Sequence, residues 1–95
     1  MIATTSIFYD TRRALKDGTY PTKIKITYQR ERKYYPTGIN LSKEDYQKVF
    51  RDRPRKEYKD IRLELEAHEQ KAAGIIKDLP VFSFEIFEKK YLNAR

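Results

Sequence analysis

The sequence predicts an α+β fold in which a three-stranded antiparallel β-sheet packs against a long C-terminal α-helix. Three observations lead to this prediction. Residues 23–29 alternate polar and apolar side chains, as a strand with one buried and one solvated face does. Segments rich in aromatic and β-branched residues precede and follow this strand. Between residues 57 and 79, apolar side chains recur at steps of three and four, the spacing of an amphipathic helix.

The flanking strands are bounded by turn-forming residues. Residues 4–10 are rich in Thr, Ile, Phe and Tyr, and the basic loop after them closes with Lys16-Asp17-Gly18-Thr19, a turn sequence. Residues 32–38 form the third strand, where Pro36 favours an edge position or the end of the strand. We expect the second and third strands to form a hairpin, with the third at the sheet edge.

Two helices are expected after the sheet. Ser42, followed by acidic residues, predicts the N-cap of a short helix that reaches about Phe50, and Pro54 interrupts the helical pattern. The long helix from about 57 to 79 has an apolar stripe of Tyr58, Ile61, Leu65, His68, Ala72, Ile75 and Leu79. Its length of roughly 34 Å exceeds that of a strand of about six residues, so part of it should extend past the sheet.

The C-terminal segment predicts a further helical unit. Pro80 ends the long helix, and Ser83 caps a new periodic segment with apolar residues Phe84, Phe87, Tyr91 and Leu92. We expect a sheet unit with a short helix over residues 1–56, a linking helix over 57–79, and the beginning of another domain over 80–95. A segment this short is unstable alone, so the native chain is expected to continue past Arg95.

The charge of the chain predicts a polyanionic partner. The 95 residues include 21 Lys and Arg against 14 Asp and Glu, a formal net charge of +7. Eight basic and three acidic residues lie in residues 1–40, whereas residues 61–95 are neutral overall. Nucleic acid is therefore the first candidate partner, with residues 1–40 as the contact surface.

Several functional classes are excluded. The chain has no cysteine, which rules out a disulfide framework, a thiolate metal site and a cysteine nucleophile. No apolar run approaches the roughly 20 residues of a membrane span. His68 has no companion ligand or nucleophile, so a structural role on the helix is favoured over catalysis. We expect a cytoplasmic protein with no cofactor, metal, membrane contact or small-molecule substrate.

The hairpin predicts one apolar and one polar face. With Arg30-Glu31 as a two-residue loop, Gln29 pairs with Arg32 and Thr27 with Tyr34. The face that is expected to pack against the long helix then carries Ile24, Ile26, Tyr28 and Tyr35. The opposite face carries Lys23, Lys25, Thr27, Gln29, Arg32 and Tyr34, which are side chains that contact phosphates and base edges in the major groove. A longer loop would change the assignments of the third strand only.

Other cations flank this face, and simpler interpretations remain open. Arg12, Arg13, Lys16, Arg30 and Lys33 are candidates to hold the DNA backbone, although Arg12 and Arg13 fit an ordinary solvated charge pair equally well. A solvated sheet face is normally polar, and adjacent tyrosines often serve cross-strand packing, so Tyr34 and Tyr35 are expected on opposite faces.

Together these segments resemble a known family. Asp10-Thr11-Arg12-Arg13, Lys16-Asp17-Gly18-Thr19-Tyr20-Pro21 and Arg32-Lys33-Tyr34-Tyr35-Pro36-Thr37-Gly38-Ile39 are similar, in order and spacing, to the N-terminal arm-DNA-binding domain of Bacteroides-type phage integrases, which are tyrosine recombinases. The match spans about residues 5–50. Residues 81–88 are similar to the opening of the core-binding, SAM-like helical domain that follows in that family.

The resemblance implies a DNA-binding module that tethers a recombinase to arm-type sites during DNA integration and excision. Its exposed sheet face would enter the major groove, and residues 57–79 would couple it to the other integrase domains. The resemblance also implies that the catalytic residues lie in a separate domain, so none is assigned in this chain. Two alternatives remain open: a double-stranded RNA or ribosome-associated binder, and a protein-interaction module.

Overall fold

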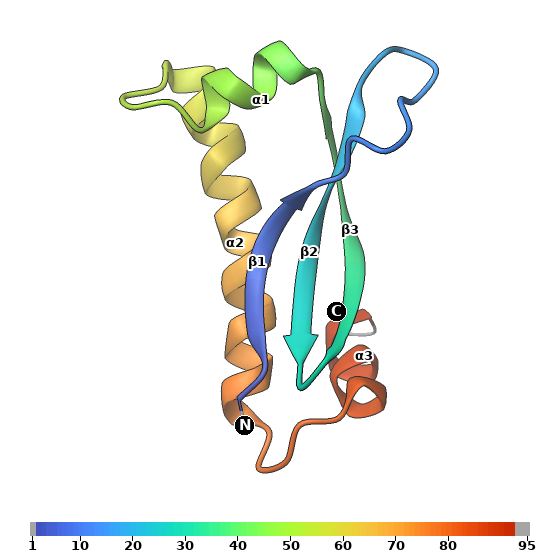
Figure 1. Ribbon diagram of the computed structural model, residues 1–95. Coiled ribbons are helices and arrows are strands. Elements are labelled where there is room, and N and C mark those ends of the chain that lie inside the picture. Colours follow the sequence, from blue (N-terminus) through green and yellow to red (C-terminus); the bar gives the residue numbers. More distant parts are fainter. Residues whose placement is uncertain (1, 93–95) are drawn as a thin grey trace.

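The sheet forms one layer of the molecule, and two helices cover one of its faces (Figure 1). The computed structural model describes residues 2–92. Its strands, β1 (Thr4–Tyr9), β2 (Tyr20–Tyr28) and β3 (Glu31–Leu41), are antiparallel in the order β1-β2-β3. Helices α1 (Lys43–Val49), α2 (Lys56–Asp78) and α3 (Phe84–Leu92) follow. The predicted fold class is confirmed, and β3 lies at the sheet edge as expected.

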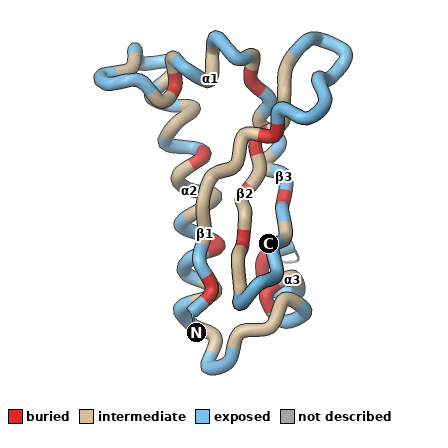
Figure 2. Tube along the Cα trace, in the orientation of Figure 1, coloured by how far each residue is buried: buried red, intermediate tan, exposed pale blue. Residues whose placement is uncertain are grey.

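Alternation along β2 determines which face is covered. Ile24 and Ile26 are fully buried, and Tyr35 of β3 lies opposite Ile24. Leu65 and Ala72 of α2 are also fully buried, in agreement with the predicted apolar stripe. Buried residues therefore lie on or next to the strands and on α1, α2 and α3, whereas most of the loop after β1 and of the α1–α2 connection is exposed (Figure 2).

The core consists of two clusters. The larger contains Ile24, Ile26, Tyr35, Ala72 and Phe87, and joins the sheet to α2 and α3. The smaller contains Leu41, Val49 and Leu65, and joins the end of β3 to α1 and α2. Ile7 of β1 packs against both clusters, so they are continuous through the sheet.

The hairpin register differs from the prediction. The loop is Gln29-Arg30, with Tyr28 opposite Glu31, and Thr27 pairs with Arg32 rather than Tyr34. This register keeps the Tyr28 ring in the sheet, 4.7 Å from the Phe82 ring. Because each partner moves by two residues, the predicted faces of β3 are unchanged even though the pairing was wrong.

The third strand is longer than predicted. It continues past Pro36 and Gly38 to Leu41, with a register irregularity opposite Pro21 to Lys23. Gly38 has a φ of 83°, which glycine adopts without steric cost. The buried Thr22 side chain donates to the Ile39 carbonyl at 2.6 Å, and its oxygen lies 2.8 Å from that of Thr37. These side-chain hydrogen bonds hold the irregular segment together.

The predicted helix starts are confirmed. The Ser42 hydroxyl accepts a hydrogen bond from the Asp45 amide, and the Ser83 hydroxyl accepts one from the Ile86 amide. In α3, Phe87 is fully buried in the larger core cluster. The division of the chain at residue 80 stays a prediction, and residues 93–95 lie outside the described residues. None of the helices within residues 2–92 is long and apolar enough to span a membrane.

Candidate nucleic-acid interface

The face of the sheet opposite the helices carries a regular array of side chains. The strand register places them in three rows across β1, β2 and β3. These rows are Thr4, Thr27 and Arg32; Ser6, Lys25 and Tyr34; and Phe8, Lys23 and Pro36. None of the described helices packs on these rows, which we call the open face.

An aromatic pair lies at the centre of the open face. The rings of Phe8 and Tyr34 are 4.8 Å apart between centroids, although their strands are separated by β2. The Lys25 ammonium lies 5.9 Å from the centroid of the Phe8 ring. The open face therefore combines a fixed apolar patch with cations at its sides.

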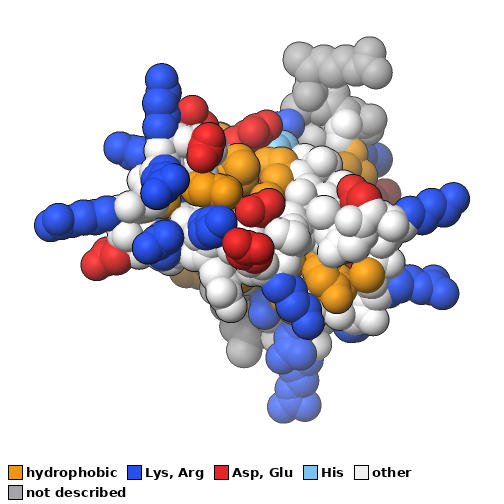
Figure 3. Space-filling view, turned by 90° about the horizontal axis from the view of Figure 1, so that it is seen from above, with side chains coloured by type: hydrophobic (Ala, Val, Ile, Leu, Met, Phe, Trp, Pro, Cys, Tyr) orange, Lys and Arg blue, Asp and Glu red, His pale blue; other side chains and the backbone are white. Residues whose placement is uncertain are grey.

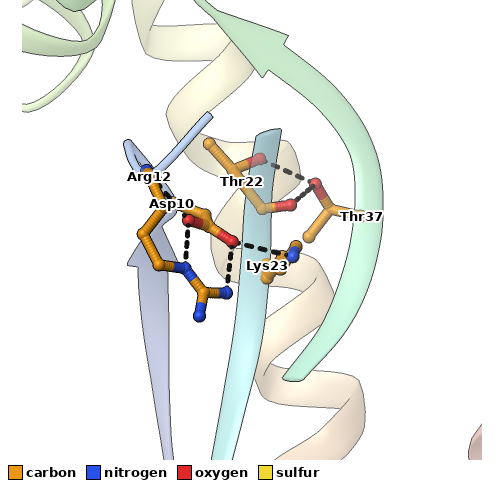
Figure 4. A network of polar contacts seen from close by, with 5 residues as sticks. All are labelled: Asp10, Arg12, Thr22, Lys23 and Thr37. Carbon is orange, nitrogen blue, oxygen red and sulfur yellow. Dashed lines mark hydrogen bonds and ion pairs between the residues drawn. The ribbon is translucent and has the colours of Figure 1, made fainter. Parts of the chain in front are cut away.

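A carboxylate organises one end of the open face. Asp10 follows β1, is 5% exposed, and accepts hydrogen bonds from Arg12 Nε at 2.9 Å, Arg12 Nη2 at 2.8 Å and Lys23 Nζ at 2.9 Å (Figure 4). The bonds from Arg12 and then Lys23 hold the pKa of the Asp10 carboxyl far below its usual range. The same contact raises the pKa of Arg12. Lys23 and Arg12 are thus partly neutralised, although the Arg12 side chain stays 73% exposed.

The loop between β1 and β2 presents further cations. Arg13 and Lys16 are exposed in it, beside Arg12. The loop is closed by a hydrogen bond from the Leu15 amide to the Thr19 carbonyl, and Asp17 accepts from the amide and hydroxyl of Thr19. The three cations therefore lie at one end of β2, on a loop with its own turn structure.

The β2–β3 turn lies at the opposite end of β2. It contains Gln29 and Arg30, which are both exposed. Gln29 has a φ of 57°, so it is a turn residue and does not belong to the rows of the open face. Its predicted position opposite Arg32 was wrong because the loop is one residue earlier than expected.

Lys33 lies on the helix-covered face, away from the other predicted contacts. It pairs with Ile26, and its ammonium lies 3.4 Å from a Glu88 carboxylate oxygen and 5.1 Å from the centroid of the Phe84 ring. The Tyr35 hydroxyl donates to the same Glu88 oxygen at 2.7 Å. This bond, assisted by Lys33, lowers the pKa of Glu88, while burial raises the pKa of Tyr35. Lys33 therefore joins β3 to α3.

Sequence reasoning missed the contribution of β1. Thr4, Ser6 and Phe8 complete the rows, but Ile7 and Phe8 are both apolar, so alternation could not show which of them is buried. It also missed Asp10. Its spacing to Arg12 is that of a side chain bonding to a backbone amide two residues on, and this bond is present at 3.2 Å.

Within residues 2–92, no group of three or more His, Cys, Asp or Glu side chains is placed to hold a metal ion. No curated protein and no solved structure matches the chain. A family model described as "Arm DNA-binding domain" matches residues 7–88.

Proposed function

The chain belongs to the arm DNA-binding domain family, whose role is to bind DNA, and from this premise we propose that the open face enters the major groove of duplex DNA. The observation that carries the proposal is the three-row array, uncovered by any helix within residues 2–92, in which Lys25, Arg32, Thr27 and Tyr34 lie together. A sheet surface of this kind fits the major groove, which admits β-ribbons.

Each part of the surface has a distinct proposed role. Arg32 and Lys25 would contact phosphates or guanine edges, and Thr27 supplies a hydroxyl for hydrogen bonds. The Phe8–Tyr34 pair offers an apolar surface for thymine methyl groups. Because these groups lie on strands, their spacing is rigid, as base recognition requires.

Cations at the two ends of β2 would hold the DNA backbone. Arg12, Arg13 and Lys16 lie at one end and Arg30 at the other, so they would bracket the groove. Lys23 would contribute less than Lys25 because Asp10 already binds its ammonium group. Lys33 is left out of the surface because it contacts α3, and Gln29 would act only from the turn.

We infer a place in DNA recombination from the resemblance to integrases. The domain would be a non-catalytic module that tethers a tyrosine recombinase to arm-type sites during integration and excision. Helix α2, which runs from the α1 end of the sheet to α3, would join it to the other integrase domains.

Two variants on the open face test the proposal. Lys25→Ala and Arg32→Ala should each weaken duplex binding, measured by fluorescence anisotropy, and Lys77→Ala on α2 is the matched control. The wild-type domain should show a log-log salt slope of roughly −4 to −6, as four to seven phosphate contacts imply. Wild-type affinity in both open-face variants, with the fold intact by NMR, would rule out this face as the DNA-binding surface.

Competition with double-stranded RNA tests whether the partner is DNA or RNA. A-form RNA has a deep, narrow major groove that a sheet cannot enter. An RNA duplex of equal length should therefore displace the DNA poorly. Equal competition by RNA would favour a double-stranded RNA binder.

A further inference from the structure

A second concentration of positive charge lies away from the open face. Between residues 48 and 62 the chain has seven Lys and Arg against three Asp and Glu. This segment covers the end of α1, the α1–α2 connection and the start of α2. It lies at the same end of the molecule as the β1–β2 loop, and Figure 3 shows Lys and Arg side chains projecting around this end.

Four of the seven cations of this segment line a hollow. A cavity of about 290 Å³ is lined by Lys48, Arg51, Arg53, Arg55, Glu57 and Tyr58. Four cations against one carboxylate give the lining a strong positive charge, and a tetrahedral phosphate group is small relative to this volume. We call this hollow the basic pocket.

The cations of the basic pocket differ in how far they are already paired. Lys48 lies 3.1 Å from Glu44 and 5.6 Å from the centroid of the Tyr58 ring, so it is held at the wall. Within residues 2–92, by contrast, Arg51, Arg53 and Arg55 form no ion pair, and all three are exposed. Three guanidinium groups gathered around one hollow repel one another unless an anion lies between them.

A second hollow lies next to the basic pocket. It has a volume of about 420 Å³, and Arg53 lines both hollows, with Lys59 and Arg62 at the second. Arg62 is partly engaged, because its guanidinium carbon lies 5.7 Å from the Phe50 ring centroid and its Nε 3.9 Å from Glu66. The basic surface therefore extends around the α1–α2 connection as a track, which suits a chain of phosphates better than one small anion.

We propose that the basic pocket binds backbone phosphates of the duplex DNA that the domain recognises. Arginine forms bidentate hydrogen bonds with phosphate oxygens, so Arg51, Arg53 and Arg55 supply the donors and Lys48 a fixed point charge. The contact is independent of base sequence, because the phosphate groups are the same at every base pair. This proposal rests on the premise that the domain binds DNA but not on the open face being the groove-binding surface.

The test removes two of the arginines. The variant combines Arg51→Gln with Arg53→Asn, since Arg53 has a φ of 53°, which asparagine tolerates well. The matched control, Lys77→Gln with Lys90→Gln, removes the same charge from exposed positions on α2 and α3. Binding is measured by anisotropy over a range of salt concentrations, and folding by thermal unfolding.

The expected result is a change in salt dependence that the control lacks. Loss of one or two phosphate contacts should reduce the magnitude of the salt slope by about 1 to 2 and weaken binding equally for different duplex sequences. The loss should be larger for a duplex that extends past the groove site than for one that ends there. A wild-type salt slope in the folded variant, or an equal loss in the control, would overturn the proposal.

A second measurement separates this proposal from the proposed function. In an NMR titration with DNA, amides of residues 51–57 report on the basic pocket and amides of residues 23–34 on the open face. Shifts at 51–57 that vanish in the arginine variant, without shifts at 23–34, would support the basic pocket and contradict the open face. Shifts at residues 23–34 alone would support the open face and contradict the basic pocket. Inorganic phosphate alone serves as a probe, and a pocket saturated by it without any response to DNA would also overturn the proposal.

Discussion

At the residue scale, one carboxylate determines how much charge the open face presents. Asp10 is almost fully buried, yet it stays ionised because Arg12 and Lys23 donate to both of its oxygens. A buried charge is tolerated only with such partners, since desolvation alone would favour the neutral acid. The same bonds fix the β1–β2 loop to β2 and occupy the Lys23 ammonium.

Asp10→Asn should therefore destabilise the domain in a pH-dependent way. The folded state lowers the pKa of Asp10, so its contribution to stability is full above the unfolded pKa of about 4 and is lost as the pH falls through the folded value. The Asn variant should be less stable than wild type at pH 7, and the difference should shrink at pH 2.5. Urea unfolding at both pH values measures this.

The control for Asp10 is Asp60→Asn, which removes an exposed carboxylate from α2. It should leave the stability nearly unchanged at both pH values. A destabilisation of the Asp10 variant that is equal at pH 7 and pH 2.5 would mean that packing, and not the charge, accounts for its effect.

At the element scale, the β2–β3 turn shows that the pairing register can change while each side chain stays on the same face of the sheet. Gln29 occupies a left-handed conformation that costs a side-chain-bearing residue roughly 1–2 kcal/mol. The strain is outweighed by the pairing that this register allows between Tyr28 and Glu31, with Tyr28 packed on Phe82.

Gln29→Gly should therefore stabilise the domain. Glycine removes the left-handed penalty but has more freedom in the unfolded chain, so we expect a net gain of roughly 0.5–1 kcal/mol in the free energy of unfolding. The neighbouring Arg30→Gly variant has no such penalty to relieve and should be neutral or destabilising. Denaturant unfolding of both variants measures the contrast, and equal effects would contradict the turn geometry.

Helix α3 gives a second prediction at this scale. Phe87 is fully buried between the Tyr35 and Tyr91 rings, at centroid distances of 5.5 and 5.2 Å. Phe87→Ala should cost roughly 3–5 kcal/mol, as large-to-small changes in a packed core do. Leu92→Ala, on an exposed position of the same helix, is the control. If the thermal midpoints of both variants match wild type, α3 does not contribute to the core.

At the scale of the whole molecule, the two core clusters should unfold together. Ile7 packs against both, and α2 contributes Leu65 to one cluster and Ala72 to the other. The elements therefore share contacts along the length of the sheet, as a cooperative unit requires.

Leu65→Ala tests this cooperativity. We expect a loss of roughly 2–5 kcal/mol from the smaller cluster, with a single transition. Amides of α3, at the far end of the molecule, should report the same lowered midpoint as amides of α1 in an NMR-monitored thermal unfolding. Unchanged melting of α3 would show that the two clusters unfold independently.

Charge at this scale also divides into two surfaces. The open face and β1–β2 loop carry one set of cations, and the α1–α2 connection carries another. The charge distribution along the sequence pointed to residues 1–40 and did not show that four of the seven cations of residues 48–62 line one hollow.

Local periodicity was enough to predict several elements of this protein. Alternation in residues 23–29 showed which side of β2 is buried, the steps of three and four in residues 57–79 showed the stripe of α2, and Ser42 and Ser83 marked helix starts. These predictions stay correct when the pairing of β2 with β3 changes, because each depends only on residues within one element.

The contacts between elements became evident only from the three-dimensional structure. It placed Lys33 against Glu88, paired Asp10 with Lys23, and set the Phe8 ring beside Tyr34. No local pattern encodes these pairs, because register, loop path and helix packing bring together residues that are distant in the chain. The sequence therefore does not distinguish a cation that is exposed on a binding surface from a cation that is held in an ion pair with another element.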